Sequence, residues 1–169
     1  MQITTLDTID EVRALEPWLS AYIHFVTADL ERFAGVTFDP SALLRNTLNS
    51  LDKVVPPQGA TLVAEAPDGR RLGMVFLRPS GAEAMEIKRL YVPETGRGQG
   101  VGKALVLHAM DVAREKGAAR LRLDSSKNLI NAINLYRNLG FRDCPPYAES
   151  DHFDDPVLGP HLVFMDCLL

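Results

Sequence analysis

Apolar and polar positions in the first part of the chain follow the period of a strand and then that of a helix. Gln2–Leu6 alternates between the two kinds of residue, which predicts a strand. Asp7 or Thr8 can then cap a mostly helical segment, Ile9–Phe33. Pro17 is either a break between two helices or a first-turn residue of the second.

In the middle of the chain the period changes again. Leucines on one side of Ser41–Leu51 predict a helix. Thr61–Ala66 and Arg71–Leu77 then read as strands, and the Pro-Asp-Gly turn between them predicts a hairpin. Met85–Val92 completes a three-stranded meander, which Pro93 ends because proline cannot continue a central ladder.

The remaining chain predicts two more helices among three strands. The helices are Gly98–Lys116 and Asn128–Leu139, with the strand Arg120–Asp124 between them. Phe141–Cys144 and His161–Leu168 are the last two strands, around a polar loop. This order predicts an α/β fold with a mixed, mostly antiparallel sheet. The central strand–helix–strand unit should be a right-handed crossover with parallel strands.

Composition narrows the class of protein without naming a function. The 169 residues predict a single domain over residues 1–169, and 46% hydrophobic with 24% charged residues is typical of globular proteins. The net charge of −4 argues against nucleic acid as a main partner. Neither a signal-peptide pattern nor a long apolar stretch is present, so we expect a cytoplasmic protein without membrane association. The cysteines and histidines show no metal-ligand spacing, so we expect no metal.

The most informative residues follow the predicted meander and open the next helix. They are Arg97, Gly98, Gln99, Gly100, Val101, Gly102 and Lys103. The glycines allow a tight turn and a close approach to a ligand. A helix N-terminus adds unpaired N–H groups and a positive dipole end, so the segment predicts a phosphate or pyrophosphate site. The alternative is a glycine-rich turn that enters an ordinary helix.

The spacing within this motif excludes two common phosphate loops. A P-loop requires glycine at position 97 and Ser or Thr at position 104, where the chain has Arg97 and Ala104. A dinucleotide fingerprint fails because Lys103 or Val101, depending on the starting glycine, occupies its last glycine position. The pattern that remains is Arg-x-x-Gly-x-Gly.

Three segments together resemble the GNAT superfamily of N-acetyltransferases. Arg-x-x-Gly-x-Gly is similar to that family's coenzyme A pyrophosphate loop, and the preceding Ile87–Pro93 resembles its fourth strand. Ala132–Phe141 is similar to the family segment Ala-x-x-Leu-Tyr-x-x-x-Gly-Phe. The resemblance implies a GNAT-like fold, with a sheet that splays between its fourth and fifth strands and helices on both faces.

The resemblance also implies acetyl-CoA as the cofactor, with coenzyme A as product. The backbone amides of residues 97–103 would hold the pyrophosphate, and the pantetheine arm would pair with the backbone of Leu90, Tyr91 and Val92. The backbone N–H of Val92 or Tyr91 would donate a hydrogen bond to the oxyanion of the tetrahedral intermediate. Asn128 is either a cofactor contact or a helix N-cap, since the family asparagine usually stands one residue nearer the tyrosine. The side chains of Arg97 and Lys103 either neutralise phosphate or lie in solvent.

The resemblance implies that two residues act as the general acid and the general base of the reaction. Tyr136 matches the family tyrosine that can protonate the departing thiolate, although its spacing also fits a core position. Glu86 is the first choice for the base and Glu83 the second, while a solvated strand glutamate is the alternative. The acidic residues between positions 149 and 155 either receive a cationic amine or form a solvated loop.

These expectations combine into one function with one main alternative. We expect an N-acetyltransferase that moves acetyl from acetyl-CoA directly to a primary amine of a small molecule, amino acid or peptide. Direct transfer is expected because no Ser-His-Asp or Cys-His pattern suggests an acyl-enzyme. A homodimer is a further family expectation. The alternative is a non-catalytic module that senses acyl-CoA, and a nucleotide-binding protein is disfavoured by the two failed spacings.

Overall fold

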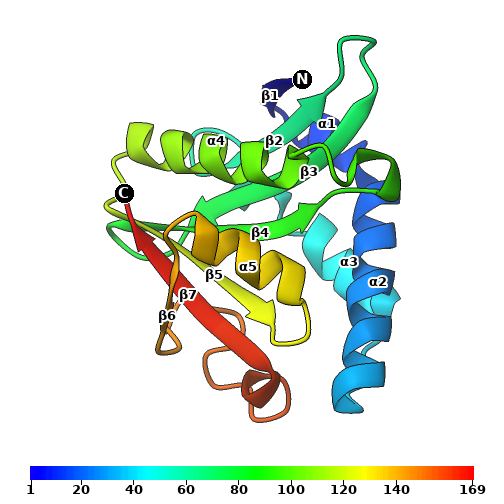
Figure 1. Ribbon diagram of the computed structural model, residues 1–169, viewed down its shortest axis with the longest axis vertical. Coiled ribbons are helices and arrows are strands. Elements are labelled where there is room, and N and C mark those ends of the chain that lie inside the picture. The colour runs from blue at the N-terminus through cyan, green and yellow to red at the C-terminus, as the bar shows by residue number, and fades with distance from the viewer.

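The chain folds around one seven-stranded sheet, described by a computed structural model of residues 1–169 (Figure 1). The strand order is β1-β2-β3-β4-β5-β7-β6. The strands are β1 Gln2–Leu6, β2 Ala60–Glu65, β3 Arg71–Pro79, β4 Ala84–Tyr91, β5 Arg120–Ser126, β6 Arg142–Cys144 and β7 Leu162–Leu168. Only β4 and β5 run parallel to each other. The predicted mixed, mostly antiparallel sheet is therefore confirmed.

The sheet opens between β4 and β5. The two strands are paired only from Ala84 with Arg120 to Glu86 with Arg122. Beyond Glu86, β4 continues to Tyr91 with a partner on the β3 side alone, whereas β5 remains paired to β7 as far as Ser126. The expected splay between the fourth and fifth strands is thus present, and it leaves one backbone edge of β4 unpaired.

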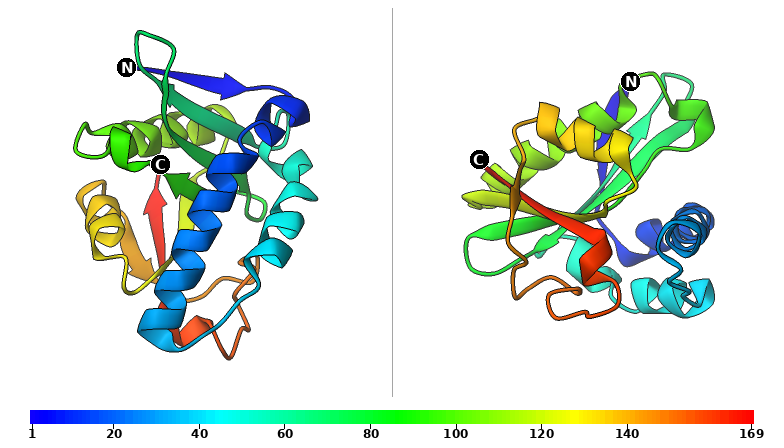
Figure 2. Two further views of the ribbon diagram at one scale, coloured as in Figure 1. Left: turned by 90° about the vertical axis from the view of Figure 1, so that its right-hand side faces the viewer. Right: turned by 60° about the horizontal axis from the view of Figure 1, so that its bottom comes forward.

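Helices cover both faces of the sheet (Figure 2). They are α1 Ile9–Arg13, α2 Glu16–Ala34, α3 Pro40–Leu48, α4 Val101–Glu115 and α5 Ile130–Asn138. The larger core joins α4 and α5 to one face through residues such as Leu105, Leu121 and Ile133. A second core joins α1 and α2 to the other face, with Leu19 against Met74 and Phe76 as an example. None of these helices has the length and apolar character needed to cross a bilayer.

Helix boundaries differ from the predicted ones where local backbone chemistry intervenes. Thr8 caps α1, and Pro17 stands in the first turn of α2, so of its two predicted roles the first-turn role is confirmed, while the break between the helices lies before it, at residues 14–15. The predicted helix from residue 98 begins only at Val101, because Gly98 and Gly100 have φ of 74° and 75°. The predicted helix from residue 128 begins at Ile130.

The connection between β6 and β7 packs onto the body of the protein. Tyr147 and Leu158 from this connection are buried with Leu30 of α2 and Phe164 of β7. The predicted polar loop therefore also contributes buried side chains to the core. The packing brings Asp151, which lies between Tyr147 and Leu158, toward β3 and β4.

Candidate functional site

The segment that leads into α4 carries a run of backbone amides without partners. The N–H groups of residues 98–103 make no hydrogen bond within the protein, and the first to do so is Ala104, which donates to the Gly100 carbonyl at 3.0 Å. A Cβ added at Gly98 or Gly100 would meet no heavy atom within 4 Å. Unpaired backbone amides at a helix N-terminus can bind an anion.

Side chains of this segment turn back onto the protein. Arg97 Nε donates to the Val92 carbonyl at 3.3 Å, and Gln99 Nε2 donates to the Thr95 carbonyl at 2.8 Å. Lys103 is exposed and pairs with no carboxylate. The backbone amides are thus free to bind an anion here, and the remaining N–H groups of Arg97 and the ammonium of Lys103 are not paired with a carboxylate.

The unpaired edge of β4 leads away from these amides. Leu90 and Tyr91 lie on it, and Val92 directly follows the strand. A register shift opposite Met74–Phe76 marks a bulge on this stretch, where Arg89 adopts a φ of 55°. An edge with free backbone groups can pair with an extended ligand.

Tyr136 of α5 is both a core residue and a candidate proton donor. The residue is only 6% exposed, and its ring lies 5.7 Å from the Phe141 ring, in the main core. Burial raises the pKa of Tyr136 far above its usual value, with smaller contributions from Tyr22 and Asp124. The hydroxyl therefore stays protonated near neutral pH and can donate.

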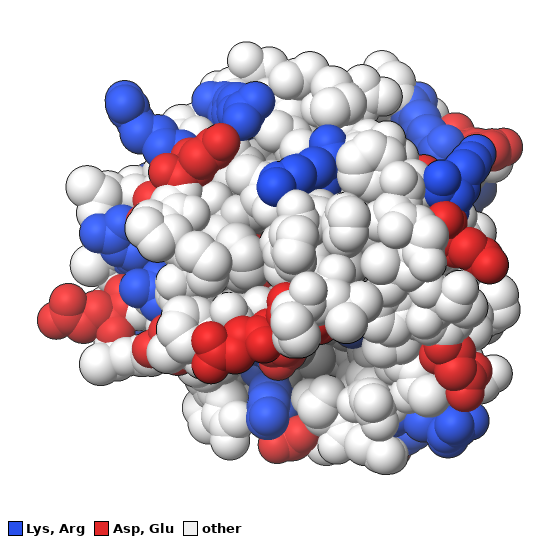
Figure 3. Space-filling model, turned by 90° about the horizontal axis from the view of Figure 1, so that it is seen from below, with Lys and Arg blue, Asp and Glu red and all other residues white.

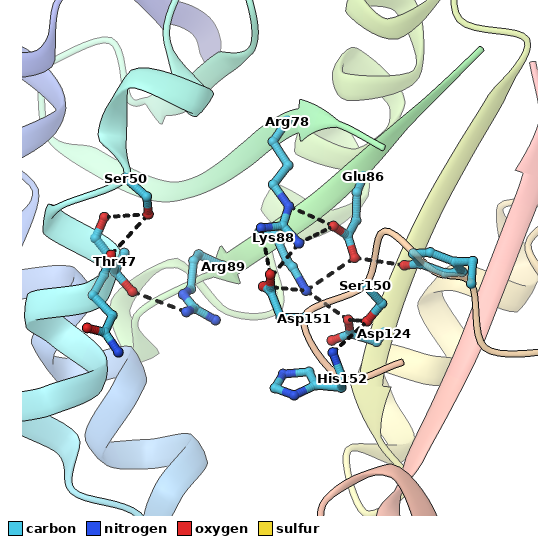
Figure 4. Close-up of polar contacts among 12 residues, drawn as sticks. Thr47, Ser50, Arg78, Glu86, Lys88, Arg89, Asp124, Ser150, Asp151 and His152 are labelled. Carbon is cyan, nitrogen blue, oxygen red and sulfur yellow. Dashed lines mark hydrogen bonds and ion pairs between the residues drawn. The ribbon is translucent and has the colours of Figure 1, made fainter. Parts of the chain in front are cut away.

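Glu86 lies at the centre of a buried ion-pair network on the other face of the sheet (Figure 4). Its side chain is 0% exposed. Arg78 Nε and the Tyr147 hydroxyl each donate to one of its oxygens at 2.7 Å, and Lys88 Nζ lies 3.2 Å from Oε1. The alternative of a solvated strand glutamate is wrong, and a base at this position could reach an amine only through other groups.

Lys88 and Arg78 extend this network to two aspartates. Lys88 Nζ donates to Asp124 Oδ2 at 2.8 Å, and Arg78 Nη1 donates to Asp151 Oδ1 at 3.1 Å. Burial opposes ionisation of both aspartates, but the nearby cations, Lys88 first among them, and side-chain hydrogen bonds together outweigh burial and hold the pKa of each carboxyl below its usual range. Burial likewise lowers the pKa of Lys88, but the carboxylates outweigh that effect and raise it. All three groups are therefore charged near neutral pH.

A cavity of about 380 Å³ adjoins the network. It lies among α2, α3, β4 and the β6–β7 connection. Its charged and titratable lining residues are Tyr22, Lys53, Arg78, Lys88, Arg89, Asp151 and His152. Much of the remaining wall is apolar, from Ile23, Val26, Leu30, Phe38, Leu43 and Leu158. Size and lining are those of a small-molecule site.

Sequence reasoning missed the basic residues of this cavity. Glu86 and Lys88 share one face of β4 by alternation, which is the signal that could have paired them. Arg78 stands directly opposite Glu86 in the β3–β4 register, so a correct hairpin alignment would have found it. Arg89 carried no signal, because only the bulge turns it toward α3.

Asn128 and Glu83 lie outside the cavity. Asn128 Nδ2 donates to Asp29 Oδ2 at 2.8 Å, and Leu129 is the N-cap of α5, so the N-cap role for Asn128 is wrong. Glu83 is exposed in the turn before β4 and does not line the cavity. Of the acidic connection, Asp151 lines the cavity, whereas Glu149 pairs with Arg122 at 3.2 Å.

The lower face of the molecule shows mixed charge (Figure 3). Acidic and basic side chains are interspersed on it, with a hollow near its centre. Such a surface offers no continuous basic track for a nucleic-acid backbone on this face.

Comparison with known proteins identifies the family. The family model described as "Acetyltransferase (GNAT) family" matches residues 23–141. The chain is 34% identical over 118 residues to an uncharacterized N-acetyltransferase of Schizosaccharomyces pombe, covering 69% of this chain and 68% of that protein. It is 36% identical over 85 residues to a streptothricin acetyltransferase of Streptomyces lavendulae, covering 50% of this chain and 45% of that one.

A solved structure shares the fold over its whole length. The PaiA N-acetyltransferase of Thermoplasma acidophilum, solved in complex with coenzyme A, superposes with a TM-score of 0.69 at 18% identity and full coverage of both chains. The family model covers well over half of this chain and agrees with the splayed sheet and the unpaired amides. The chain therefore belongs to the acetyltransferase (GNAT) family, and it is an acyl-CoA-dependent acyltransferase.

Proposed function

We propose that this chain transfers acetyl from acetyl-CoA directly to a primary amine that enters the cavity beside β4. The observation that carries the proposal is the run of unpaired amides over residues 98–103. These N–H groups, at the positive end of α4, suit a pyrophosphate. Coenzyme A joins a pyrophosphate to a pantetheine arm long enough to follow the unpaired edge of β4.

The cofactor would then present its thioester at the opening between β4 and β5. Backbone groups of Leu90, Tyr91 and Val92 would pair with the pantetheine amides, as a strand edge pairs with an extended peptide. Asn128 remains a proposed contact, although its amide is already engaged with Asp29. The bound coenzyme A of the Thermoplasma relative supports this choice of cofactor.

The reaction needs a neutral amine, a stabilised oxyanion and a protonated leaving group. The amine nitrogen attacks the thioester carbonyl, and the N–H of Tyr91 or Val92 stabilises the resulting oxyanion. The carbon–sulfur bond then breaks, and the thiolate takes a proton from the hydroxyl of Tyr136. The amine's own proton passes toward Glu86 through groups that face the cavity, since Glu86 itself has no exposed surface.

A matched pair of glycine variants tests the cofactor site. Gly100 and Gly69 both have positive φ, 75° and 80°, and both face open space, but Gly69 lies in the β2–β3 turn. Valine strains the backbone at either position. We expect Gly100→Val to weaken coenzyme A binding at least about tenfold in calorimetry, and Gly69→Val to leave it unchanged.

Turnover is tested by thiol release from acetyl-CoA with a panel of primary amines. The proposal predicts amine-dependent release that Gly100→Val lowers through the KM for acetyl-CoA. Equal coenzyme A affinity in the two glycine variants would remove the loop from the cofactor site. Tight binding without thiol release for any amine would instead favour the non-catalytic, acyl-CoA-sensing alternative.

A further inference from the structure

Arg89 presents an uncompensated cation inside the cavity. Its Nη2 donates to Thr47 Oγ1 at 3.1 Å, and its guanidinium carbon lies 5.8 Å from the Tyr22 ring centroid. No carboxylate oxygen lies within 4.0 Å of it, in contrast to Arg78 and Lys88. A guanidinium has five N–H donors, so most of those of Arg89 are available to a ligand.

The backbone at Arg89 also distinguishes it. Arg89 is the only non-glycine residue with positive φ. This conformation costs free energy in a residue with a Cβ, and such strain concentrates at functional sites. In Figure 4 Arg89 stands between Thr47 and the ion-pair network. Because of the bulge, the Arg89 side chain lies in the cavity and takes no part in the ion-pair network of its neighbour Lys88.

The network end of the cavity has the opposite charge balance. There the cations Arg78 and Lys88 meet the carboxylates of Glu86, Asp124 and Asp151, which leaves one negative charge in excess. Asp151 is the accessible one, with its side chain 53% exposed against 0% for Glu86 and 11% for Asp124. One end of the cavity therefore suits an ammonium group, and the Arg89 end suits an anion.

We infer that the acceptor is a free amino acid with an apolar side chain. Its amine lies at the Asp151 end, its carboxylate pairs with Arg89, and its side chain packs on the apolar wall that includes Val26 and Phe38. The planar guanidinium matches a carboxylate in shape. A peptide N-terminus has a neutral amide at the position where a free amino acid has the carboxylate that pairs with Arg89. The inference deepens the proposed function and rests on it.

A series of acceptors with one shared side chain tests this inference. L-leucine, L-leucinamide and 3-methylbutylamine carry the same branched group, with the carboxylate kept, neutralised or removed. The phosphonate analogue of leucine separates a carboxylate from another oxyanion. We expect kcat/KM from thiol release to be about 10- to 100-fold higher for leucine than for the other three. The amine of leucinamide is the more easily deprotonated, so its intrinsic reactivity works against this result.

Variants at Arg89 assign the preference to its side chain. Glycine adopts a φ of 55° without strain, so Arg89→Gly removes the guanidinium while the bulge is retained. We expect it to lower kcat/KM for leucine far more than kcat/KM for leucinamide, so that the two acceptors become nearly equal. Arg89→Lys should recover part of the loss. Arg70→Gly, in the exposed β2–β3 turn, is the matched control and should behave as wild type.

Three results would overturn the inference while the proposed function stands. These are equal turnover of leucine and leucinamide, a leucine preference that survives Arg89→Gly, and a preference for the phosphonate. If no amine is turned over, the proposed function fails, and calorimetry with N-acetyl-L-leucine and its amide in the presence of coenzyme A decides instead. Tighter binding of the acid that Arg89→Gly removes would support the carboxylate site, and equal binding would overturn it.

Discussion

Tyr136 shows how one residue can serve both the core and the reaction. Its ring packs in the main core, but nothing in the protein hydrogen-bonds the hydroxyl. Tyr136→Phe should therefore lower kcat by about 100-fold or more, the scale of general acid catalysis, without a loss of stability. Calorimetry should give an unchanged affinity for coenzyme A. An unchanged kcat would exclude Tyr136 as the proton donor.

For Glu86 we expect a loss of stability, in contrast to Tyr136, because both of its carboxylate oxygens are hydrogen-bonded or ion-paired. Glu86→Gln keeps the shape but removes the buried charge that Arg78 and Lys88 face. We expect the free energy of unfolding, measured in urea, to fall by about 3 kcal/mol.

Glu83→Gln is the control for this measurement, because Glu83 is exposed in the turn before β4. It should stay within about 0.5 kcal/mol of wild type. Similar values for the two variants would show that the Glu86 network contributes nothing particular to stability.

At the scale of single residues, the sequence predicted the face of the sheet on which a side chain lies better than the groups that it contacts. Alternation along β4 places Glu86 on one face of the sheet, but it cannot say what covers that face. Arg78 reaches Glu86 through the β3–β4 register, and Tyr147 reaches it from a connection far along the chain. Both contacts depend on tertiary packing, so a solvated glutamate and a buried one look the same in the sequence.

The start of α1 allows an element-scale prediction, because the sequence left two caps open. Thr8 Oγ1 accepts from the Glu11 N–H at 3.3 Å, while the Glu11 carboxylate accepts from the Thr8 N–H at 2.9 Å. This reciprocal capping box makes Thr8 the cap. Thr8→Ala should lower the free energy of unfolding by about 1 kcal/mol.

Asp7→Ala is the matched control for this prediction. The side chain of Asp7 takes no part in the capping box, although its N–H donates to Glu11. The control should stay close to wild type in thermal or urea unfolding. A larger loss for Asp7→Ala than for Thr8→Ala would contradict the assignment of the cap.

Helices and strands were predictable where the apolar period agreed with residues that cap or end an element. Their exact bounds were less predictable. The strand Gln2–Leu6 has its predicted bounds, since a clear alternation and a capping residue delimit it. The start of α4 was placed three residues early, because glycines at positive φ read as helix by spacing alone. The polar composition of the β6–β7 connection gives no signal for the burial of Tyr147 and Leu158, which depends on tertiary packing.

At the scale of the whole molecule the fold was predictable and the cavity was not. The element order and the three family-like segments predicted the sheet, its parallel pair and its splay. The cavity depends on α2, α3, β4 and the β6–β7 connection coming together around the ion-pair network (Figure 4). No single segment carries that arrangement, so only the assembled chain shows its charge balance.

The same network should make stability depend on pH at both extremes. The folded-state pKa values of Asp124 and Asp151 are lowered, because Lys88, the other nearby cations and side-chain hydrogen bonds together outweigh the effect of burial. Their contribution is complete above the ordinary aspartate pKa of about 3.9 and is lost as the pH falls through the folded-state values. The pKa of Lys88 is raised, so its contribution is complete below about 10.4 and is lost as the pH rises beyond that.

Urea unfolding from pH 2 to 11 should therefore show a plateau with two falling limbs. Asp124→Asn should flatten the acid limb, whereas Asp111→Asn, exposed on α4, should not. An acid limb of equal steepness in Asp124→Asn and wild type would show that other carboxylates dominate acid unfolding.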